Sequence, residues 1–507
     1  MSFEVDACIH GDSERNLCCL NYEPKETKMN TWNVSWLVLP VLLLLTGCLS
    51  GDGSSSSSGS SLTSQTVVYL ADQDIDQVFE LYLAGSGTKL NPPLPSGRSV
   101  ISFALTPDKT AVVYIADQTT DNVFELYRVN IATPGQSVKL NGTLQSSGDV
   151  SNFAITPDGT SVVYLADQVT DQVFEVYRVL FSNPGSSVQL NPALSAGQTV
   201  SRFAVTPDSA RVVYIADQTT PTVNELYQVA LANPLNGTRL NTPLVPGRNV
   251  TDFAISLNSL MVVYRADQIT LGVFEIYLAQ MFTPEFGVRL NGPLPPGGNV
   301  TTSFAVTLNS AAVIYLADET TNGIVELYQV RFSLPTQSVK LNGLLTAGGN
   351  VSAFAIVPNG SAVVYRADQD IPSVEELYRV ALAPIGAAQK VNPAYGAGQS
   401  VNSFVITLDS TAVVYTADQT TVNVVQLYQV RFSALQVSTP PLNGPLVSGG
   451  NVLNFLISTF STNVYYRATQ TRVGVEELYA VNVGTPGVSL KLNGPLVPGG
   501  NVAEFTL

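Results

Sequence analysis

The sequence lacks almost all of the residue types that build the commonest catalytic and metal sites. Its 507 residues include one histidine, two tryptophans and four cysteines. All of these lie before residue 49, and they are His10, Trp32, Trp36, Cys8, Cys18, Cys19 and Cys48. The rest of the chain therefore has no Ser-His-Asp or Cys-His catalytic group, no zinc site built on histidine or cysteine, and no disulfide.

Charge is also scarce. Only 12% of the residues are charged, the formal net charge is −15, and no run of lysine or arginine occurs anywhere. Because proteins neutralise nucleic-acid phosphates with clustered basic side chains, we exclude nucleic acid as a partner. The low share of charged residues favours many short, buried strands.

What the sequence does contain is a repeat. A segment of the type Tyr-Leu-Ala-Asp-Gln, followed by Glu-Leu-Tyr, recurs at intervals of 50 or 51 residues after a first interval of 45. A fixed period of this length indicates one supersecondary unit copied many times. The second tyrosine of the segment falls at Tyr82, Tyr127, Tyr177, Tyr227, Tyr277, Tyr328, Tyr378, Tyr428 and Tyr479.

One repeat, residues 150–194, shows four strands and no helical periodicity. Its β-branched and aromatic runs are separated by turn residues such as Pro157-Asp158-Gly159. Four short strands in 50 residues are typical of a propeller blade. The predicted strands are 151–156, 161–166, 173–179 and 187–191.

Four segments of this repeat resemble the WD40-like repeat of TolB-type propellers. They are Phe-Ala-Ile-Thr-Pro-Asp-Gly (153–159), Val-Val-Tyr-Leu-Ala-Asp-Gln (162–168), Glu-Val-Tyr (175–177) and Leu-Asn (190–191). The resemblance covers residues 66–507 and implies an all-β propeller of four-stranded blades. Glutamine or glutamate follows the aspartate where that family has arginine, and nothing before residue 66 resembles the α/β domain of TolB. We therefore carry over the fold and not the role in the Tol-Pal system.

The two ends of the repeat region complement each other. Residues 66–71 read as a second strand, and residues 501–507 read as a first strand. We predict that residues 502–507 supply the innermost strand of the blade begun by residues 66–95. This pairing would close a single propeller of nine blades and remove its exposed sheet edges. The alternative is eight blades with one irregular copy.

The N-terminal part of the sequence predicts that the protein is located in the cell envelope. An apolar stretch at 36–47 has the length of a signal-peptide core, and Leu45-Thr46-Gly47-Cys48 resembles the lipobox of bacterial lipoproteins. This resemblance implies a signal peptide at 1–47, cleavage before Cys48 and acylation of its thiol. Residues 1–28 read as an extension that precedes a start at Met29. An ordinary signal peptide cut nearby and a weak transmembrane anchor are the alternatives.

Residues 48–65 form a Ser/Gly-rich stretch that we interpret as a flexible tether between the lipid and the propeller. We accordingly expect the protein in the bacterial cell envelope, held in the outer membrane and facing the periplasm or the cell surface.

Repeated carboxylates are the first candidate site. Eight aspartates occupy equivalent positions, and a glutamate follows eight residues later in most copies; the exceptions are Thr469 and Gln426. The functional interpretation is a ring of cation sites, with calcium as the one cofactor considered. The aspartates are Asp72, Asp117, Asp167, Asp217, Asp267, Asp318, Asp368 and Asp418, and the glutamates are Glu80, Glu125, Glu175, Glu225, Glu275, Glu326, Glu376 and Glu477.

The first copy is the most calcium-like, because Asp72, Asp74 and Asp76 alternate as at the start of a calcium loop. It lacks the glycine and the distant glutamate of a complete loop. We favour a structural interpretation, in which each aspartate accepts N–H groups of its own turn and each glutamate binds a donor of a neighbouring blade.

Three arginines interrupt the repeat symmetry. Arg265, Arg366 and Arg467 replace the apolar residue after a second-strand tyrosine in alternate copies. They either line one arc that binds an anionic ligand or pair with a glutamate in the neighbouring hairpin. We favour the ion pairs, because a cation beside a buried strand requires a partner.

These patterns predict a monomeric, lipid-anchored propeller without catalytic activity that binds an envelope protein or glycan. The predicted binding face carries the Asp-Gln loops and connections such as 290–299. Two alternatives stay open: a carboxylate-dependent glycosidase or lyase, since such chemistry needs only two acids, and a calcium-stabilised, adhesin-like surface protein.

Overall fold

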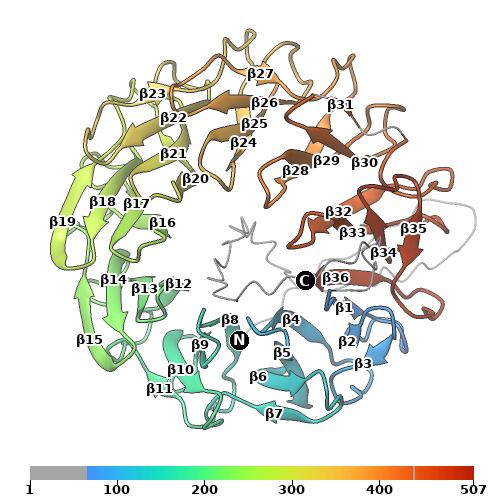
Figure 1. Ribbon diagram of the computed structural model, residues 1–507. Coiled ribbons are helices and arrows are strands. Elements are labelled where there is room, and N and C mark those ends of the chain that lie inside the picture. The colour runs from blue at the N-terminus through green and yellow to red at the C-terminus, as the bar shows by residue number, and fades with distance from the viewer. Residues whose placement is uncertain (1–64, 435, 438–439) are drawn as a thin grey trace, which may run out of the picture. The chain divides into compact units, whose positions relative to one another are not determined.

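The computed structural model describes residues 65–434, 436–437 and 440–507. These residues form nine four-stranded antiparallel sheets arranged as the blades of a propeller (Figure 1). None of them belongs to a helix that could cross a bilayer. The signal peptide, the acylated Cys48 and nearly all of the tether predicted above lie outside the described residues.

The first three blades run from the N-terminal end of the described chain. Blade 1 contains β1 (Val68–Ala71), β2 (Glu80–Leu83), β3 (Thr88–Lys89) and the last strand of the chain, β36 (Val502–Thr506). Blade 2 contains β4 (Val100–Leu105), β5 (Ala111–Thr120), β6 (Val123–Asn130) and β7 (Ser137–Lys139). Blade 3 contains β8 (Val150–Ile155), β9 (Ser161–Ala166), β10 (Glu175–Leu180) and β11 (Val188–Gln189).

The next three blades repeat this order, innermost strand first. Blade 4 contains β12 (Val200–Val205), β13 (Arg211–Ala216), β14 (Glu225–Ala230) and β15 (Asn233–Arg239). Blade 5 contains β16 (Val250–Ile255), β17 (Met261–Ala266), β18 (Glu275–Gln280) and β19 (Thr283–Arg289). Blade 6 contains β20 (Val300–Val306), β21 (Ala312–Ala317), β22 (Glu326–Arg331) and β23 (Val339–Lys340).

The last three blades lead to the C-terminus. Blade 7 contains β24 (Val351–Ile356), β25 (Ala362–Ala367), β26 (Glu376–Ala381) and β27 (Gln389–Lys390). Blade 8 contains β28 (Val401–Ile406), β29 (Ala412–Ala417), β30 (Gln426–Arg431) and β31 (Gln436–Val437). Blade 9 contains β32 (Val452–Ile457), β33 (Asn463–Ala468), β34 (Glu477–Asn482) and β35 (Ser489–Lys491).

Blade 3 shows why this sequence forms such sheets. All six residues of β9 are buried, because both faces of a blade pack against neighbouring blades. In register, Tyr164 of β9 lies opposite Tyr177 of β10, and the two rings stack with centroids 5.5 Å apart. Directly opposed aromatic pairs of this kind stabilise antiparallel strands. The equivalent pair occurs in every blade, with centroid distances between 5.3 and 5.7 Å.

The hydrophobic core lies between the blades. Val163 and Leu165 of blade 3, for example, belong to the same buried cluster as Phe203 and Tyr214 of blade 4. Figure 1 shows the innermost strands, such as β4, β8 and β12, facing the centre of the ring. Each blade therefore buries apolar side chains against the blade before it and the blade after it.

The ring closes as predicted, with nine blades. Strand β36 pairs antiparallel with β1, with Tyr69 opposite Phe505 and Leu70 opposite Glu504. Tyr69 and Phe505 also share a buried cluster with Tyr465 and Leu478 of blade 9. The interface between blades 9 and 1 thus repeats the interfaces elsewhere in the ring, and the eight-blade alternative is wrong.

The connections fall on two opposite faces. The loop after the second strand and the connection from the fourth strand to the next first strand are joined by hydrogen bonds, as from Asp149 N–H to the Asp167 carboxylate (2.6 Å). We call this side the Asp-loop face. The other two turns of each blade form the turn face, where Phe181 N–H donates to the Thr160 carbonyl (3.1 Å).

Removing residues 501–507 tests the closure. The shortened protein leaves β1 with a free inner edge and uncovers the cluster shared by blades 9 and 1, so we expect a lower melting temperature and concentration-dependent association. Thermal unfolding and light scattering measure both effects. A matched control lacks only Leu507 and keeps every pairing of β36 with β1. A shortened protein that stays monomeric with the control's melting temperature contradicts this role of β36.

Candidate functional site

The repeated aspartates of the Asp-loop face are engaged within the fold. In blade 5, one oxygen of Asp267 accepts the N–H of Asn249 (2.7 Å) and the other accepts the N–H of Gly272 (3.0 Å). The first bond joins the loop to the preceding connection, and the second closes the loop on itself. Each carboxylate therefore fixes two backbone segments at once.

The same two bonds occur at all eight aspartates. The N–H donors are Asn501 and Gln77 for Asp72, Ser99 and Asn122 for Asp117, Asp149 and Gln172 for Asp167, Thr199 and Thr222 for Asp217, Asn249 and Gly272 for Asp267, Asn299 and Gly323 for Asp318, Asn350 and Ser373 for Asp368, and Ser400 and Asn423 for Asp418. In blade 9 the hydroxyl of Thr469 accepts one of the two, the N–H of Asn451 (2.8 Å).

The calcium-like first loop follows this pattern. Asp72 accepts its two backbone N–H groups, while Asp74 forms an ion pair with Lys89 (2.9 Å). Asp76 lies beside Gly499, in the connection that precedes β36. Within the described part of the chain, no three acids, histidines or cysteines are grouped as a metal site requires.

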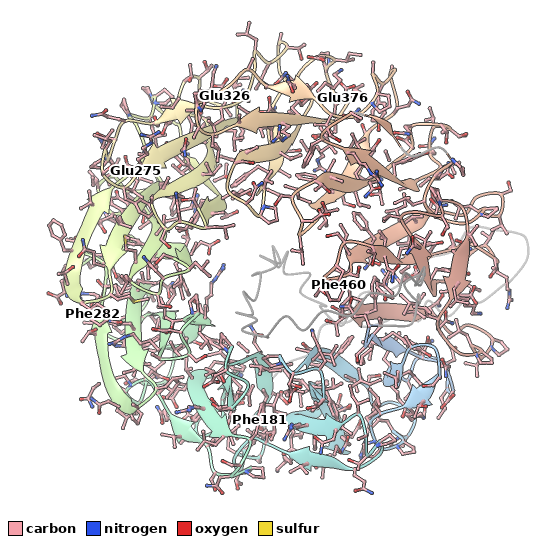
Figure 2. The ribbon with its side chains drawn as sticks, viewed as in Figure 1. Phe181, Glu275, Phe282, Glu326, Glu376 and Phe460 are labelled. Carbon is pink, nitrogen blue, oxygen red and sulfur yellow. The ribbon has the colours of Figure 1, made fainter. Side chains whose placement is uncertain are left out.

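The repeated glutamates are buried, and their partners differ from the prediction. We expected a donor from a neighbouring blade, but the donors belong to the same blade. Glu326 accepts bonds from Lys340 (2.9 Å) on the adjacent strand β23 and from Tyr328 (2.9 Å) two residues along its own strand β22. A side chain on the fourth strand faces one on the third across the sheet, so the shorter contact lies within the blade. Figure 2 marks Glu275, Glu326 and Glu376 in three successive blades.

The glutamate and its cation are lost together in blade 8, where Gln426 replaces the acid and Pro441 stands where blade 7 has Lys390. In blade 3 the partner is Gln189, whose amide donates to Glu175 (2.8 Å). This joint loss indicates that the acid and the cation serve each other rather than a ligand.

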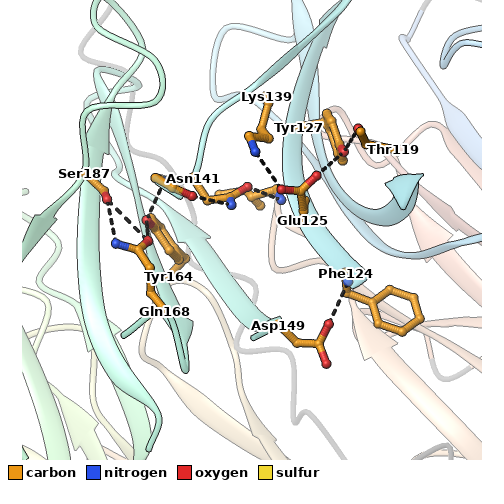
Figure 3. Close-up of polar contacts among 12 residues, drawn as sticks. Thr119, Phe124, Glu125, Tyr127, Lys139, Asn141, Asp149, Tyr164, Gln168 and Ser187 are labelled. Atoms are coloured by element: carbon orange, nitrogen blue, oxygen red, sulfur yellow. Dashed lines mark hydrogen bonds and ion pairs between the residues drawn. The ribbon is translucent and has the colours of Figure 1, made fainter. Parts of the chain in front are cut away.

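Blade 2 shows the complete network (Figure 3). Lys139 and Tyr127 both donate to Glu125, and the hydroxyls of Tyr127 and Thr119 lie 2.7 Å apart. Asn141 of the Leu-Asn motif accepts the N–H of Leu126 (2.8 Å). Each conserved element of the repeat therefore has a hydrogen-bonded position inside its blade.

Two of the three symmetry-breaking arginines form ion pairs. Arg366 Nε lies 3.1 Å from Glu375 and Arg467 Nε lies 3.4 Å from Glu476, within the same blade in each case. All three arginines also donate to a first-strand carbonyl of the next blade. The acceptors are Val300 for Arg265, Val401 for Arg366 and Val502 for Arg467.

For Arg265 the expected glutamate partner was wrong. Phe274 stands where blades 7 and 9 have Glu375 and Glu476, and the guanidinium of Arg265 lies over the Phe274 ring at 4.0 Å. Burial lowers the pKa of Arg265 to about 10, although Asp252 and Asp267 partly offset the effect. The three arginines thus connect neighbouring blades and are not assembled into one anion site.

With the acids engaged, the Asp-loop face exposes polar side chains such as Thr220 and Asn322, and among them one or two aliphatic side chains in most blades. Leu344 is the extreme case, with 89% of its surface exposed. Sequence reasoning missed these residues, although a signal exists: even-numbered blades have Thr-Thr after the Asp-Gln or Asp-Glu pair, and odd-numbered blades do not. The exposed residues are Ile75, Val169, Val245, Ile269, Leu271, Leu344, Ile371, Val422 and Val473.

The alternation has a structural basis. The first threonine of each Thr-Thr pair places its hydroxyl against the third-strand tyrosine, as Thr219 does with Tyr227 (2.7 Å). Where Ile269 takes that position, the loop exposes an aliphatic side chain in place of a hydroxyl-bearing one.

Comparison with known proteins supports the fold alone. No protein-family model matches the sequence, and no curated protein is similar to it in sequence. A crystal structure of a eukaryotic initiation factor is 10% identical, with a TM-score of 0.53 over 87% of this chain and 98% of that one. Dipeptidyl peptidase 4 of Porphyromonas gingivalis is 10% identical, with a TM-score of 0.56 over 78% of this chain and 59% of that one.

A putative TolB from Agrobacterium tumefaciens is 11% identical, with a TM-score of 0.29 over 47% of this chain and 79% of that one. The similar structures thus include enzymes as well as proteins of other kinds. A propeller fold shared at this level of identity carries no particular activity.

Substitutions at Asp267 test the structural role of the loop acids. Asp267→Ala removes the acceptor of two backbone N–H groups, and we expect a loss of about 3 kcal/mol in the free energy of unfolding. Asp267→Thr imitates blade 9, keeps one acceptor and should lose less. Chemical unfolding measures both, and addition of a chelator should leave the parent's melting temperature unchanged. A melting temperature that falls with chelator and recovers with calcium contradicts this role.

The glutamates predict a specific response to acid. Burial alone raises the pKa of Glu326, but hydrogen bonds from Lys340 and Tyr328 outweigh it, so the net pKa is lowered; Glu477 behaves likewise with Lys491 and Thr471. An acid whose pKa is lower in the folded state stabilises the protein above its unfolded pKa, and this stability is lost as the pH falls through the folded pKa.

Glu326→Gln combined with Glu477→Gln should therefore lower the melting temperature at pH 7 and flatten its decline below about pH 4.5. Glu504→Gln is the control of opposite sign, since burial raises the pKa of Glu504 and Arg467 only partly offsets this. An acid dependence that is as steep in the double variant as in the parent shows that these ion pairs do not contribute.

Proposed function

We propose that this protein is a lipid-anchored scaffold of the bacterial cell envelope that binds a partner protein through its Asp-loop face. The observation that carries the proposal is the set of exposed aliphatic side chains on that face, beside acids that the fold itself employs. Exposed apolar residues that recur on one face, from blade to blade, make that face a candidate interaction surface. They favour a protein over a glycan, because a glycan is bound mainly through hydrogen-bonding side chains.

The loops that carry these side chains are held in place before any partner arrives. In blade 5, Val273 N–H donates to the Thr270 carbonyl (3.0 Å), and Asp267 accepts Gly272 N–H. Ile269 and Leu271 project from this closed loop. A preorganised loop loses little conformational entropy on binding, which supports docking of a folded partner.

The chain enters the propeller on the opposite side. Ala84 N–H donates to the Val67 carbonyl, and the Leu507 carbonyl accepts a bond from Lys109 in a turn of blade 2, so both ends of the propeller lie on the turn face. A flexible tether of the length of residues 48–64 spans roughly 20–25 Å on average. An acylated Cys48 would therefore be joined to the propeller through the turn face, which leaves the Asp-loop face free of the attachment point.

An enzymatic function is less well supported. A glycosidase or lyase requires two acids placed around a substrate, whereas the repeated acids occupy equivalent positions and accept backbone or same-blade hydrogen bonds. A calcium-stabilised adhesin meets the same objection, because the loop carboxylates already have donors from the protein.

Site-directed photocrosslinking in the native envelope tests the proposal. A photoreactive amino acid is placed at Leu344, Leu271 or Val169 on the Asp-loop face and, as controls, at Phe460 or Phe282 on the turn face (Figure 2). We expect the three loop positions to yield the same adduct, and the two controls to yield none of it. Mass spectrometry then identifies the partner.

A matched variant tests the anchor. Cys48→Ser should move the protein out of the membrane fraction and reduce the yield of the adduct. Adducts that form only at Phe460 and Phe282 contradict the assignment of the face, and a Cys48→Ser protein that stays in the membrane contradicts the lipid anchor.

A further inference from the structure

Three blades carry an arginine directly after the third-strand tyrosine, and the structure treats them differently. Arg178 in blade 3 is fully engaged: its Nε donates to the Ser161 hydroxyl (3.0 Å), and a terminal nitrogen donates to the Leu231 carbonyl (3.4 Å) of the next blade. Arg128 and Arg379 occupy the same position in blades 2 and 7.

Arg128 makes neither of these bonds. Ala111 takes the place of Ser161, and the buried Nε of Arg128 has no hydrogen-bond partner. Phe181 of the next blade (labelled in Figure 2) takes the place of Leu231, and the guanidinium of Arg128 stacks over its ring at 4.8 Å and does not bond to its carbonyl. Among the described residues, Arg128 forms no hydrogen bond or ion pair. Asp108 interacts electrostatically with Arg128, but its carboxylate is already bonded to Thr106 and Thr110.

The same substitution recurs in blade 7. Ala362 replaces the serine, Phe432 lies under the guanidinium of Arg379 at 5.0 Å, and the Nε of Arg379 is again without a partner. A half-buried cation stacked on an aromatic ring keeps the edge of its guanidinium free, and that edge fits a carboxylate with two parallel hydrogen bonds.

Arg128 lines a pocket between the outer parts of blades 2 and 3. The pocket has a cavity volume of about 100 Å³ and opens to solvent, and its lining includes Arg128, Asn130, Gln136, Val138, Phe181 and Pro184. The side-chain amides of Asn130 and Gln136 form no hydrogen bond to other described residues. The lining thus combines one cation and two free amides with an apolar wall, around a space smaller than that of a typical drug-sized ligand site.

We propose that this pocket, the Arg128 pocket, binds a small monocarboxylate with an apolar body. The carboxylate bonds to the guanidinium edge of Arg128, the amides of Asn130 and Gln136 orient it, and the apolar body lies against Val138 and Pro184. The pocket lies on the outer rim, away from the exposed aliphatic residues of the Asp-loop face, so this site is independent of the proposed partner binding.

Ligand-observed fluorine NMR on the full chain tests the pocket, with 4-fluorobenzoate as the probe and 4-fluorobenzyl alcohol as its uncharged counterpart. Every protein carries Arg379→Met, so that the equivalent pair in blade 7 contributes nothing. We expect the benzoate to bind at least tenfold more tightly than the alcohol. Adding Arg128→Met should weaken benzoate binding at least tenfold, whereas adding Arg178→Met should leave it unchanged.

Thermal unfolding of each variant first establishes that it is folded. Arg128→Lys serves as a second variant that keeps the charge and loses the planar fork, and it should weaken binding several-fold. The proposal is overturned if the benzoate does not bind, if it binds no better than the alcohol, or if Arg128→Met and Arg178→Met have equal effects.

Discussion

The packing of one blade against the next is the interaction on which this structure depends. Each blade packs one face against the blade before it and the other face against the blade after it. Because the ring is closed, these two faces must be complementary at every interface, including the one between blades 9 and 1. Strand β36 meets this requirement by completing blade 1 beside β1, so that the cluster around Tyr69 and Tyr465 repeats the clusters of the other interfaces. A closed ring of this kind leaves no unpaired innermost edge.

This constraint separates residues that maintain the fold from residues that are free to bind. An element present in nearly every blade, such as Asp267 or Glu326, has a hydrogen-bonded role that recurs in eight of the nine blades. Function is instead expected where the copies differ. The exposed Leu344 of the Asp-loop face and the unpartnered Arg128 of the outer rim are both departures of this kind. Arg366 shows that a departure can also be structural, because its ion pair with Glu375 stays inside the blade.

Much of the architecture could be predicted because the repeat reports it many times. The spacing of the tyrosines gave the number of blades, and the incomplete first and last repeats gave the closure. The aspartates could be interpreted correctly, since a short acid in a turn accepts nearby N–H groups. The partner of the glutamates could not, because strand spacing alone does not tell whether Lys340 of the same sheet or a residue of the next one lies closer. Ser209 is a similar case. It has a positive φ of 58°, and its hydroxyl accepts the N–H of Asp158 in the preceding blade. This contact between blades could not be predicted from the sequence.

The arginine sites that depend on the absence of one serine hydroxyl, at Arg128 and Arg379, were the hardest to predict from the sequence. The sequence alone does not show that Ala111 of blade 2 stands where a hydrogen-bond acceptor could be. This becomes clear only in blade 3, where the equivalent residue, Ser161, accepts a bond from Arg178. All of this rests on a closed ring of nine equivalent interfaces, which single-particle electron microscopy can examine directly. Class averages viewed along the axis should show nine radial densities of equal spacing in an unbroken circle. Eight densities, or an arc with a gap between blades 9 and 1, would contradict it.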